Sequence, residues 1–433
     1  MNFEKVCVLG LGYIGLPTAA VLAGQGVNVI GVDINRDIVN GLQNGKIHIY
    51  EEGLYELVTE AIRLGKLRVC TEPEPADAFI IAVPTPFYED KRADMRAVTA
   101  ATEAVVPHLR HGNLVVLEST SPPLTTRNLV VPILECSGLR AGEDFYVVYS
   151  PERVLPGRIL KELGEKARVI GGLNKLSAVA GRDLYSLFAK GQIVLTDCTT
   201  AEMVKLMENT YRDINIAIAN EFSRLADRFG VDIWEAISIA NLHPRVKILT
   251  PGVGVGGHCI GVDPWFLVEA APELTPLIYT ARRVNDAQPH YIVALVRRAL
   301  QDQLFGRRIA ALGLSYKPDV DDLRESPAIE VVKKLVEAGA VVKAFEPYKV
   351  DAKIDGIQMV SKLETALADA EVVLLLVGHK QFLSLTPQQL ILQTPARLIV
   401  TAANAWRGKE WTEAGFNMIH LGIGKGDKVF PAV

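Results

Sequence analysis

Three glycines and an aspartate near the start of the chain have a spacing that suits phosphate chemistry. Residues 10–15 read GLGYIG and directly follow the apolar run Val6–Leu9, and Asp33 ends the next apolar run, eighteen residues after Gly15. Such glycines permit a tight turn and let the backbone approach a pyrophosphate, whose charge then lies at a helix N-terminus. The carboxylate of Asp33 can accept a hydrogen bond from a ribose 2′-hydroxyl and repels a 2′-phosphate. The pattern predicts a dinucleotide site that prefers NAD to NADP; a purely structural turn is the alternative.

A second glycine-rich stretch ends in a cysteine. Residues 251–263 read PGVGVGGHCIGVD. Backbone amides in such a loop can approach the Cys259 thiol and favour the thiolate that nucleophilic catalysis requires. The alternatives are a buried loop cysteine and, for Asp263, an N-cap of the helical pattern that follows it. His258 stands beside Cys259 without a second spaced pair of ligands, so no metal is expected.

Lys205 and Asn209 are four residues apart in a stretch with a helical pattern, and therefore share a helix face. An ammonium and an amide on one face can stabilise a developing oxyanion. Two solvated helix residues are the alternative.

Two further cations stand close to the end of an expected strand. Lys317 and Arg324 lie within residues 313–327, which read GLSYKPDVDDLRESP. Cations at strand ends of an α/β sheet are placed to hold phosphates. A charged loop at the start of a helix is the alternative.

The elements that position these residues alternate between short β-branched runs and helical patterns in two parts of the chain. The runs expected to be strands are Val6–Leu9, Val27–Val32, Ala78–Val83, Leu114–Leu117, Phe145–Val148, Ile309–Leu312, Val341–Phe345, Val372–Val377 and Leu398–Thr401. Such alternation predicts an α/β fold with two Rossmann-like, doubly wound parallel sheets. No internal repeat is evident beyond this shared texture.

A long helix is expected between the two sheets. Residues 200–229 contain neither Gly nor Pro, follow the candidate caps Asp197 and Thr199, and end at Gly230. At 1.5 Å per residue the helix would be about 45 Å long, which suits a connecting or dimer-forming helix better than a crossover in a sheet. The predicted domains are therefore an NAD-binding domain at 1–198, a central helical dimerisation domain at 199–300 and a substrate-binding α/β domain at 301–433.

Composition excludes several classes of protein. Lys and Arg number 46 against 50 Asp and Glu, so the basic footprint of a nucleic-acid binder is missing. Apolar residues at 49% and charged residues at 22% are typical of a globular chain. Nothing approaches about 18 consecutive apolar residues, so no membrane partner is expected. The five cysteines form no CxxC pair, which favours a reducing compartment and a cytoplasmic location.

Taken together, these segments resemble the nucleotide-sugar 6-dehydrogenases, the family of UDP-glucose, GDP-mannose and UDP-N-acetylhexosamine dehydrogenases. The resemblance covers nearly the whole chain. Its motifs are GLGYIGLP at 10–17, VPTP at 83–86, EST at 118–120, SPE at 150–152, the Lys205/Asn209 helix, GVGVGGHC ending at Cys259, and YKPDVDDLRESP at 316–327. The resemblance implies an N-terminal NAD domain, a central helix that forms a homodimer, and a C-terminal domain that binds the UDP-sugar.

The resemblance also implies a role for each matched residue. Cys259 would be the nucleophile that traps the C6 aldehyde, and Asp263 its neighbouring acid/base. Lys205 and Asn209 would stabilise the oxyanion, and Thr120 and Glu152 would position water. The implied cofactor-binding residues are Gly10, Gly12, Tyr13, Ile14, Gly15, Asp33, Thr85, Thr120 and Arg324. The implied substrate-binding residues are Glu152, Arg153, Val154, Lys205, Asn209, Gly254, Lys317, Arg407 and Arg245, the last acting from the partner subunit.

Two departures bear on the sugar. The UDP-glucose enzymes read PEFLAEG where residues 151–157 read PERVLPG, so Pro156 replaces a carboxylate, and Val262 stands where they have a lysine. These stretches are similar to UDP-N-acetylmannosamine dehydrogenases. The resemblance thus implies NAD-dependent, four-electron oxidation of the C6 hydroxyl of UDP-N-acetyl-D-mannosamine through a cysteine thiohemiacetal and thioester. The alternatives are UDP-GlcNAc or UDP-glucose as substrate, a two-electron β-hydroxyacid dehydrogenase, and a non-catalytic NAD-binding protein.

Overall fold

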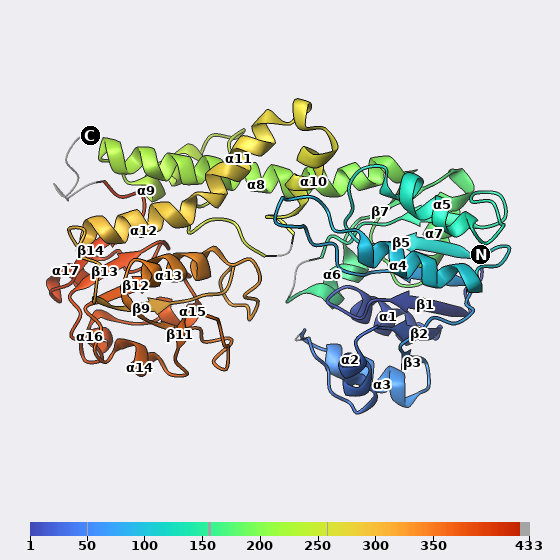
Figure 1. Cartoon of the computed structure of the whole chain (residues 1–433), viewed down its shortest axis with the longest axis horizontal. Coiled ribbons are helices and arrows are strands. Elements are labelled where there is room, and N and C mark those ends of the chain that lie inside the picture. The colour runs from blue at the N-terminus through green and yellow to red at the C-terminus, as the bar shows by residue number, and fades with distance from the viewer. Residues whose placement is uncertain (50, 155–156, 258, 425–433) are drawn as a thin grey trace. The chain divides into compact units, whose positions relative to one another are not determined.

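The chain folds into two compact units. The structure is a computed structural model that describes residues 1–49, 51–154, 157–257 and 259–424 (Figure 1). Unit 1 comprises Met1–Glu208 with Trp265–Leu274, and unit 2 comprises Asn209–Pro264 with Thr275–Val433. The three domain boundaries expected from the sequence remain predictions.

Unit 1 is built on an eight-stranded sheet with the order β3-β2-β1-β4-β5-β6-β7-β8. Its strands are β1 (Lys5–Leu9), β2 (Asn28–Val32), β3 (Leu67–Cys70), β4 (Ala78–Ile81), β5 (Leu114–Leu117), β6 (Tyr146–Tyr149), β7 (Arg168–Gly172) and β8 (Ile193–Asp197). All neighbours are parallel except β6 and β7, which pair antiparallel. The predicted parallel sheet is therefore confirmed from β3 to β6, and two strands of reversed direction, β7 and β8, extend it, as often happens beyond the parallel part of an α/β sheet.

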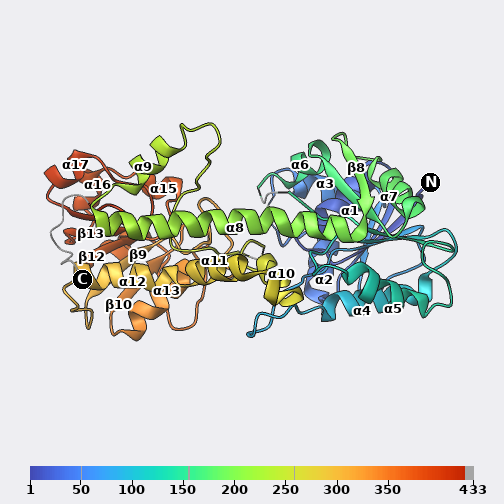
Figure 2. The same cartoon turned by 90° about the horizontal axis from the view of Figure 1, so that it is seen from above.

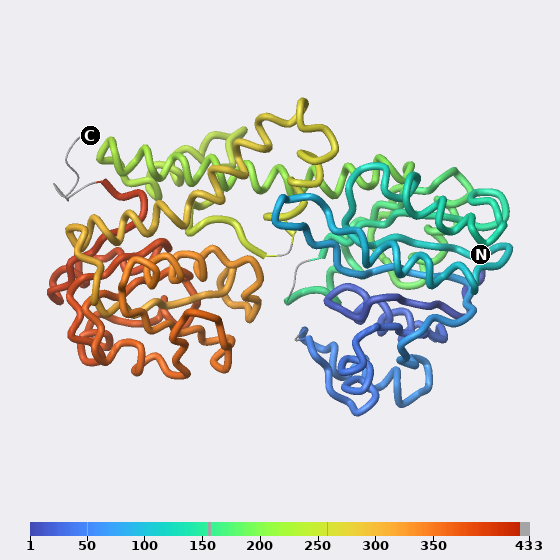
Figure 3. The backbone as a smooth tube through the Cα atoms, viewed as in Figure 1, coloured from blue at the N-terminus to red at the C-terminus, as the bar shows by residue number. Residues whose placement is uncertain are grey.

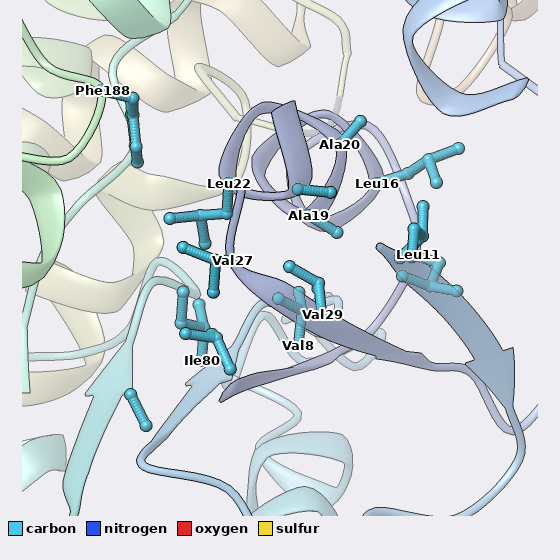
Figure 4. Close-up of a cluster of buried hydrophobic side chains, with 14 of the residues drawn as sticks. Val8, Leu11, Leu16, Ala19, Ala20, Leu22, Val27, Val29, Ile80 and Phe188 are labelled. Carbon is cyan, nitrogen blue, oxygen red and sulfur yellow. The ribbon is translucent and has the colours of Figure 1, made fainter. Parts of the chain in front are cut away.

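Helices cover both faces of this sheet. They are α1 (Gly15–Gly24), α2 (Arg36–Gln43), α3 (Leu54–Arg63), α4 (Arg96–Val105), η1 (Val106–His108), η2 (Thr126–Val130), α5 (Val131–Glu135), α6 (Ile159–Glu165) and α7 (Lys175–Tyr185). Two further helices, α10 (Asp263–Ala270) and η3 (Pro272–Leu274), come later in the chain, and α10 begins in unit 2. On β1, Val8 packs into the cluster that holds Leu16 of α1 (Figure 4), whereas Leu9 packs into the cluster that holds Val98 of α4. Alternate residues of one strand thus enter two cores, the pattern of a doubly wound sheet.

Unit 2 contains a six-stranded, entirely parallel sheet with the order β11-β10-β9-β12-β13-β14. Its strands are β9 (Arg308–Leu312), β10 (Val341–Phe345), β11 (Gln358–Met359), β12 (Val372–Leu375), β13 (Leu398–Thr401) and β14 (Asn417–His420). Its helices are α9 (Ile233–Ala240), α11 (Pro276–Asp286), α12 (Gln288–Ala299), α13 (Pro327–Glu337), α14 (Leu363–Leu367), α15 (Lys380–Leu383), α16 (Pro387–Ile391) and α17 (Lys409–Glu413). Ala311 and Leu312 of β9 enter different cores, so this sheet is also doubly wound.

The two sheets repeat one topology. In chain order, the strands of unit 2 and the first six strands of unit 1 have the same arrangement, 3-2-1-4-5-6, and Figure 3 traces the chain through each set of crossovers. The loop after the first strand reads GLGYIG at 10–15 and GLSYKP at 313–318. The alternating texture that the sequence shows in both parts of the chain is therefore one strand order used twice. Only Gly, Leu and Tyr are shared between the loops, and the glycines that make the first loop recognisable are replaced in the second.

The long helix predicted for residues 200–229 is confirmed. Helix α8 (Cys198–Phe229) has 32 residues and is uninterrupted (Figure 2). Asp197 caps it, because its Oδ1 accepts a hydrogen bond from the backbone N–H of Thr200 at 3.1 Å. Thr199, the other candidate cap, lies inside the helix. No helix within the described residues combines the length and apolar character that a membrane crossing requires.

Candidate active site

The three glycines after β1 are required for different reasons. A Cβ on Gly10, which has φ +92°, would lie 2.6 Å from the carbonyl oxygen of Ala82, and a Cβ on Gly15 would lie 1.8 Å from that of Gly10. A Cβ on Gly12 would meet nothing within 4 Å. Gly10 and Gly15 are therefore fixed by the fold, whereas Gly12 faces open space at the N-terminus of α1. This arrangement fits a pyrophosphate that approaches the backbone.

Asp33 stands beside this loop, directly after β2. Its Oδ2 accepts a hydrogen bond from the backbone N–H of Leu11 at 3.0 Å, and its Oδ1 accepts one from Asn35 at 2.9 Å. The side chain is only partly buried, so its remaining lone pairs can accept from a ribose hydroxyl. Tyr13 and Ile14 are also partly exposed on the loop, and Ile14 precedes the first turn of α1. The residues of unit 1 thus fit the predicted binding of NAD.

Two predicted contacts follow neighbouring strands of the same sheet. Thr85 is buried and follows β4, and Thr120 is partly buried and follows β5. Between them, the Ser119 hydroxyl donates to the carbonyl oxygen of Val83 at 2.7 Å and ties the two strand ends together. These strand ends lie on the carboxyl edge of the sheet, next to the point where the strand order reverses between β1 and β4, where α/β sheets bind ligands.

Glu152 follows β6 and is buried, at 8% exposure. Its Oε1 accepts hydrogen bonds from the backbone N–H groups of Arg153 and Val154 at 2.6 and 3.1 Å. Its Oε2 accepts one from Nη2 of Arg168 at 2.9 Å. The carboxylate is therefore held in a single orientation. Pro156, which replaces a carboxylate of the UDP-glucose enzymes, lies outside the described residues.

The Arg168 guanidinium also faces Glu118, with 3.7 Å between Nη1 and Oε1. The Tyr185 hydroxyl donates to the same Glu118 oxygen at 2.5 Å. Burial raises the pKa of Glu118 above its usual range, and the positive charge of Arg168 opposes this effect. Sequence reasoning assigned no role to these three residues. A charged residue directly after a fully apolar strand, as Glu118 is after β5, was the available signal.

Arg153, a predicted substrate contact, is engaged within unit 1. Its Nε and Nη2 donate to the carboxylate of Glu208 on α8 at 3.0 and 2.5 Å, and its Nη1 donates to the carbonyl oxygen of Ala167 at 2.9 Å. The guanidinium therefore links the loop after β6 to α8. Because the Arg153 guanidinium is already engaged within unit 1, it is not presented to a substrate as a free cation. What unit 1 presents here is the loop after β6.

In unit 2, glycines bring the cysteine loop against the loop at 313–327. A Cβ on Gly256 would lie 2.4 Å from the carbonyl oxygen of Glu325, and the Gly257 N–H donates to the carbonyl oxygen of Arg324 at 3.1 Å. The predicted substrate contact Gly254, at φ +130°, packs near Pro327 in the same way. His258 lies outside the described residues. The glycines thus serve close packing between two loops that carry candidate site residues.

Cys259 is exposed at the end of this loop. Its carbonyl oxygen accepts a hydrogen bond from the N–H of Asp263 at 2.9 Å, in the turn that begins α10. Cys198, at the start of α8, is instead fully buried, and burial raises the pKa of its thiol. Of these two cysteines, only Cys259 is accessible to a substrate.

Asn209 and Asp263 form a buried pair beside the cysteine loop. The Asn209 Nδ2 donates to Oδ2 of Asp263 at 2.5 Å, and the two side chains are 7% and 2% exposed. Lys205 lies one turn earlier on α8 and is 8% exposed. Within the residues that the structure describes, its ammonium has no hydrogen-bond or ion-pair partner. A buried ammonium of this kind is suited to bind a negative group supplied from outside the chain.

Lys317 is electrostatically coupled to Cys259. Burial lowers the pKa of the Lys317 ammonium, as does the positive charge of Arg212, whereas the negative charges of Asp322 and of a Cys259 thiolate raise it. The attraction between ammonium and thiolate is mutual.

The three predicted arginine contacts differ in their surroundings. Arg324 donates through Nη2 to Oδ2 of Asp322 at 2.7 Å. Arg407 forms an ion pair with Asp232, and its Nη1 donates to Asn404 at 3.1 Å. Arg245 is exposed in the loop after α9.

Unit 1 thus brings together the predicted cofactor residues up to Thr120 and the water-positioning residue Glu152. Unit 2 brings together Cys259, Asp263, Asn209 and Lys317. Among the described residues, no group of three or more His, Cys, Asp and Glu side chains is arranged to hold a metal ion.

Comparison with known proteins agrees with this division of labour. Residues 4–189 match the NAD binding domain of the UDP-glucose/GDP-mannose dehydrogenase family, residues 199–287 its central domain and residues 310–408 its UDP binding domain.

Individual relatives match along almost their whole length. NDP-N-acetyl-D-galactosaminuronic acid dehydrogenase of Ralstonia solanacearum is 48% identical, over 94% of this chain and 98% of that protein. UDP-N-acetyl-D-mannosamine dehydrogenase of Methanocaldococcus jannaschii is 44% identical, over 98% of this chain and 97% of that protein. The solved structure of UDP-D-ManNAc dehydrogenase from Pyrococcus horikoshii is 39% identical and superposes with a TM-score of 0.91, over 98% of this chain and 100% of that one. The chain belongs to the UDP-glucose/GDP-mannose dehydrogenase family and is an NAD-dependent UDP-sugar dehydrogenase.

Proposed function

We propose that this enzyme oxidises the C6 hydroxyl of UDP-N-acetyl-D-mannosamine to the carboxylate, through a thioester on Cys259. The observation that carries the proposal is the exposed Cys259 thiol, at the end of a glycine-rich loop that packs against the loop of Lys317. Family membership favours this reaction over the two-electron and non-catalytic alternatives. The sugar is supported by the names of the Methanocaldococcus and Pyrococcus relatives. The Ralstonia relative favours an N-acetylgalactosamine configuration as the second candidate.

The NAD site is assigned to the loop of Gly10, Gly12 and Gly15 with Asp33. When bound there, NAD supplies the hydride acceptor for each of the two oxidations. The open space over Gly12 leaves room for its pyrophosphate, and Asp33 is placed for a ribose hydroxyl. Thr85 and Thr120 complete the set at the neighbouring strand ends.

Chemistry at the sugar is assigned to Cys259 and the groups around it. The Cys259 thiolate attacks the C6 aldehyde, a carbon–sulfur bond forms, and the carbonyl oxygen becomes an oxyanion. Lys205 and Asn209 stabilise this oxyanion as donors. Asp263, oriented by Asn209, accepts the proton that leaves the C6 hydroxyl.

The thiohemiacetal becomes a thioester once its C6 hydrogen leaves as hydride to the acceptor, and hydrolysis then completes the reaction. Glu152 accepts a proton from water, the water oxygen attacks the acyl carbon of the thioester, and the carbon–sulfur bond breaks. Cys259 then leaves as a thiolate and the sugar as a carboxylic acid, which loses its remaining proton to solvent and becomes the uronate. Glu152 suits this role because its carboxylate is fixed in orientation from within unit 1.

A substrate panel with counted NADH tests the proposal. UDP-ManNAc, UDP-GalNAc, UDP-GlcNAc and UDP-glucose are each offered to the enzyme, and two NADH per sugar are expected with UDP-ManNAc. Cys259→Ser should abolish uronate formation while binding of NAD and the UDP-sugar survives. Cys136→Ser, at an exposed cysteine, is the matched control. Near-normal uronate production by Cys259→Ser would contradict the thioester route. If only UDP-GalNAc were turned over, UDP-GalNAc would take the place of UDP-ManNAc as the proposed substrate.

A cytoplasmic homodimer formed through α8 is part of the same proposal. Its support is a row of exposed apolar side chains at helical spacing, Tyr211, Ile218, Phe222, Leu225 and Phe229. An isolated helix face of this kind costs free energy in water unless it is covered. Light scattering should show a dimer that Phe222→Glu weakens, and a fully active monomer would contradict it.

A further inference from the structure

In unit 1, the Glu152 carboxylate belongs to a buried network of charged side chains that packing alone does not require. Arg168, at the start of β7, lies between the carboxylates of Glu118 and Glu152, and the three side chains are 5%, 0% and 8% exposed. The guanidinium also stacks over the ring of Tyr185, 4.4 Å from its centroid, and Nη1 contacts the Ser150 hydroxyl at 3.4 Å. Residues from the ends of β5 and β6, from β7 and from α7 therefore meet at one cation.

Such a network is costly to keep. Taking charges out of water is expensive, and apolar residues of similar volume often serve stability equally well. The arrangement does one thing that an apolar core cannot. The backbone N–H groups of Arg153 and Val154 fix Oε1 of Glu152, and Nη2 of Arg168 fixes Oε2. Together these contacts set both the direction and the plane of the carboxylate.

Arginine, rather than lysine, is suited to this position. One nitrogen of the guanidinium faces Glu152, while the other faces Glu118 and Ser150. A single ammonium on a flexible stem cannot hold separate partners at fixed angles in this way. Tyr185 stacks on the guanidinium and also donates to Glu118. It therefore contacts both Arg168 and the second carboxylate that holds Arg168 in place.

We propose that Arg168, anchored by Glu118 and Tyr185, is a positioning residue that orients Glu152 for hydrolysis of the thioester. This inference rests on the proposed function of Glu152 and goes beyond it. Arg168 acts through Glu152 and touches neither substrate nor cofactor in this role. The step it serves is the one in which water gives a proton to Glu152 and the acyl carbon–sulfur bond breaks. Loss of Arg168 should therefore slow this step and leave the two preceding oxidations intact.

Arg168→Lys tests the proposal in the full-length enzyme. We expect kcat to fall about tenfold or more while KM for NAD and for the UDP-sugar stays within about twofold. Slow hydrolysis should leave a rapid burst of about two NADH per subunit, followed by slow turnover. Intact mass spectrometry should then show the acyl-nucleotide adduct on the enzyme. Glu152→Gln is measured in parallel as the benchmark, and Arg182→Lys, at an exposed arginine of α7, is the matched control.

The outcomes separate the two proposals. If Glu152→Gln accumulates the adduct and Arg168→Lys does not, the positioning role of Arg168 is overturned and the role of Glu152 survives. If Glu152→Gln itself accumulates no adduct, the proposed function of Glu152 fails and the inference fails with it. If Arg168→Lys does not fold, Glu118→Gln decides, because it keeps the Arg168–Glu152 contact and most of the shape. A smaller fall in kcat with the same adduct supports the inference, and unchanged turnover overturns it.

Discussion

The two sheets of this enzyme use the same turn after their first strand. In unit 1, the Gly10 N–H donates to the carbonyl oxygen of Val32 at 2.8 Å, and in unit 2 the Gly313 N–H donates to that of Phe345 at 3.0 Å. Both glycines have positive φ, at +92° and +85°. The chain therefore leaves β1 and β9 through the same backbone turn.

The acidic residue after the second strand is also repeated, but it faces different partners. Oδ2 of Asp33 accepts from Leu11 N–H at 3.0 Å, and Oε2 of Glu346 accepts from Leu314 N–H at 2.7 Å. Asp33 is partly exposed. Glu346 is fully buried, and its Oε2 also accepts from Ser315 N–H at 2.9 Å. The longer side chain reaches under the loop, where no ribose can reach it.

A buried histidine completes the anchor in unit 2. His379 Nδ1 accepts from the Asp319 N–H at 2.9 Å, so its Nε2 carries the proton that faces Oε2 of Glu346 at 3.1 Å. The same Nε2 lies 3.2 Å from the Ser315 hydroxyl. Glu346 and His379 therefore hold both ends of the segment that presents Lys317.

The difference shows how one topology supports two kinds of ligand site. In unit 1, glycines leave the backbone open, and the strand-end acid remains available as a ligand for ribose. In unit 2, Ser315 and Pro318 stand in place of Gly12 and Gly15, and Lys317 stands in place of Ile14. The acid becomes an internal anchor, and a side-chain cation is presented instead. The fold supplies the position of each proposed site, and the choice of residues decides which groups are presented there.

The largest effect is expected from removing the anchor in unit 2. Glu346→Ala leaves the donors of Leu314, Ser315 and His379 buried without an acceptor, which should cost about 3–5 kcal/mol of stability. Asp33→Ala should cost less, about 1–2 kcal/mol, because Asp33 is only partly buried and one of its two donors, the N–H of Asn35, belongs to an exposed residue. Native-state hydrogen exchange of the β9 and β1 amides measures each unit separately. Equal losses of stability in the two variants would contradict the view that Glu346 is an internal anchor and Asp33 a ligand for ribose.

The next effect concerns two glycines of the first loop. Gly15→Ala should destabilise unit 1 by about 1–3 kcal/mol, because its Cβ would lie 1.8 Å from a backbone oxygen. Gly12→Ala should change stability by less than about 0.5 kcal/mol, yet weaken NAD binding, since the methyl group enters the space left for the pyrophosphate. Thermal denaturation and NAD titration check the pair. If Gly12→Ala bound NAD with normal affinity, the pyrophosphate would not lie in the space over Gly12.

Much of this arrangement could be predicted from the sequence, because strands buried on both faces read as apolar runs. Leu114–Leu117, Val341–Phe345 and Leu398–Thr401 have the same bounds in the structure. Strand β8 was not predicted, because its residues alternate irregularly between exposed and half-buried positions. The repeat of GLGYIG as GLSYKP was missed because recognition of such a loop depends on its glycines.

The pairing of side chains was beyond sequence reasoning for a different reason. Arg168 meets Glu118 and Glu152 across 50 and 16 residues of chain, and no periodicity within one element encodes such a contact. Local patterns did place Lys205 and Asn209 on one helix and Cys259 at the end of a glycine loop. The sequence therefore indicated which residues carry charge at strand ends, and the fold determined their partners.

A smaller effect is expected on cofactor choice. Asp33→Asn removes the negative charge that opposes a 2′-phosphate, so the preference for NAD over NADP should relax by about tenfold, mainly through KM for NADP. Glu346→Gln should leave this preference unchanged, because Glu346 has no access to a ribose. Comparing kcat/KM for the two cofactors in both variants checks the prediction. An unchanged preference in Asp33→Asn would mean that the carboxylate does not face the 2′-position.

The smallest effect concerns acid stability. Burial acts to raise the pKa of Glu346, but the hydrogen bond from His379 and those from the backbone N–H groups outweigh it, so the pKa lies below its usual value of 4.5. A carboxylate with a lowered pKa stabilises the folded state fully above its unfolded pKa, and this stabilisation is lost as the pH falls through the folded pKa. The stability difference between the parent enzyme and Glu346→Gln should therefore be constant above about pH 5 and shrink below pH 4.5. Hydrogen exchange of β9 and β10 between pH 3.5 and 6.5 measures it, with Glu364→Gln on α14 as an exposed control. A difference that stays constant down to pH 3.5 would show that Glu346 is held by its shape alone, and that the charge of the anchor contributes nothing to the loop that presents Lys317.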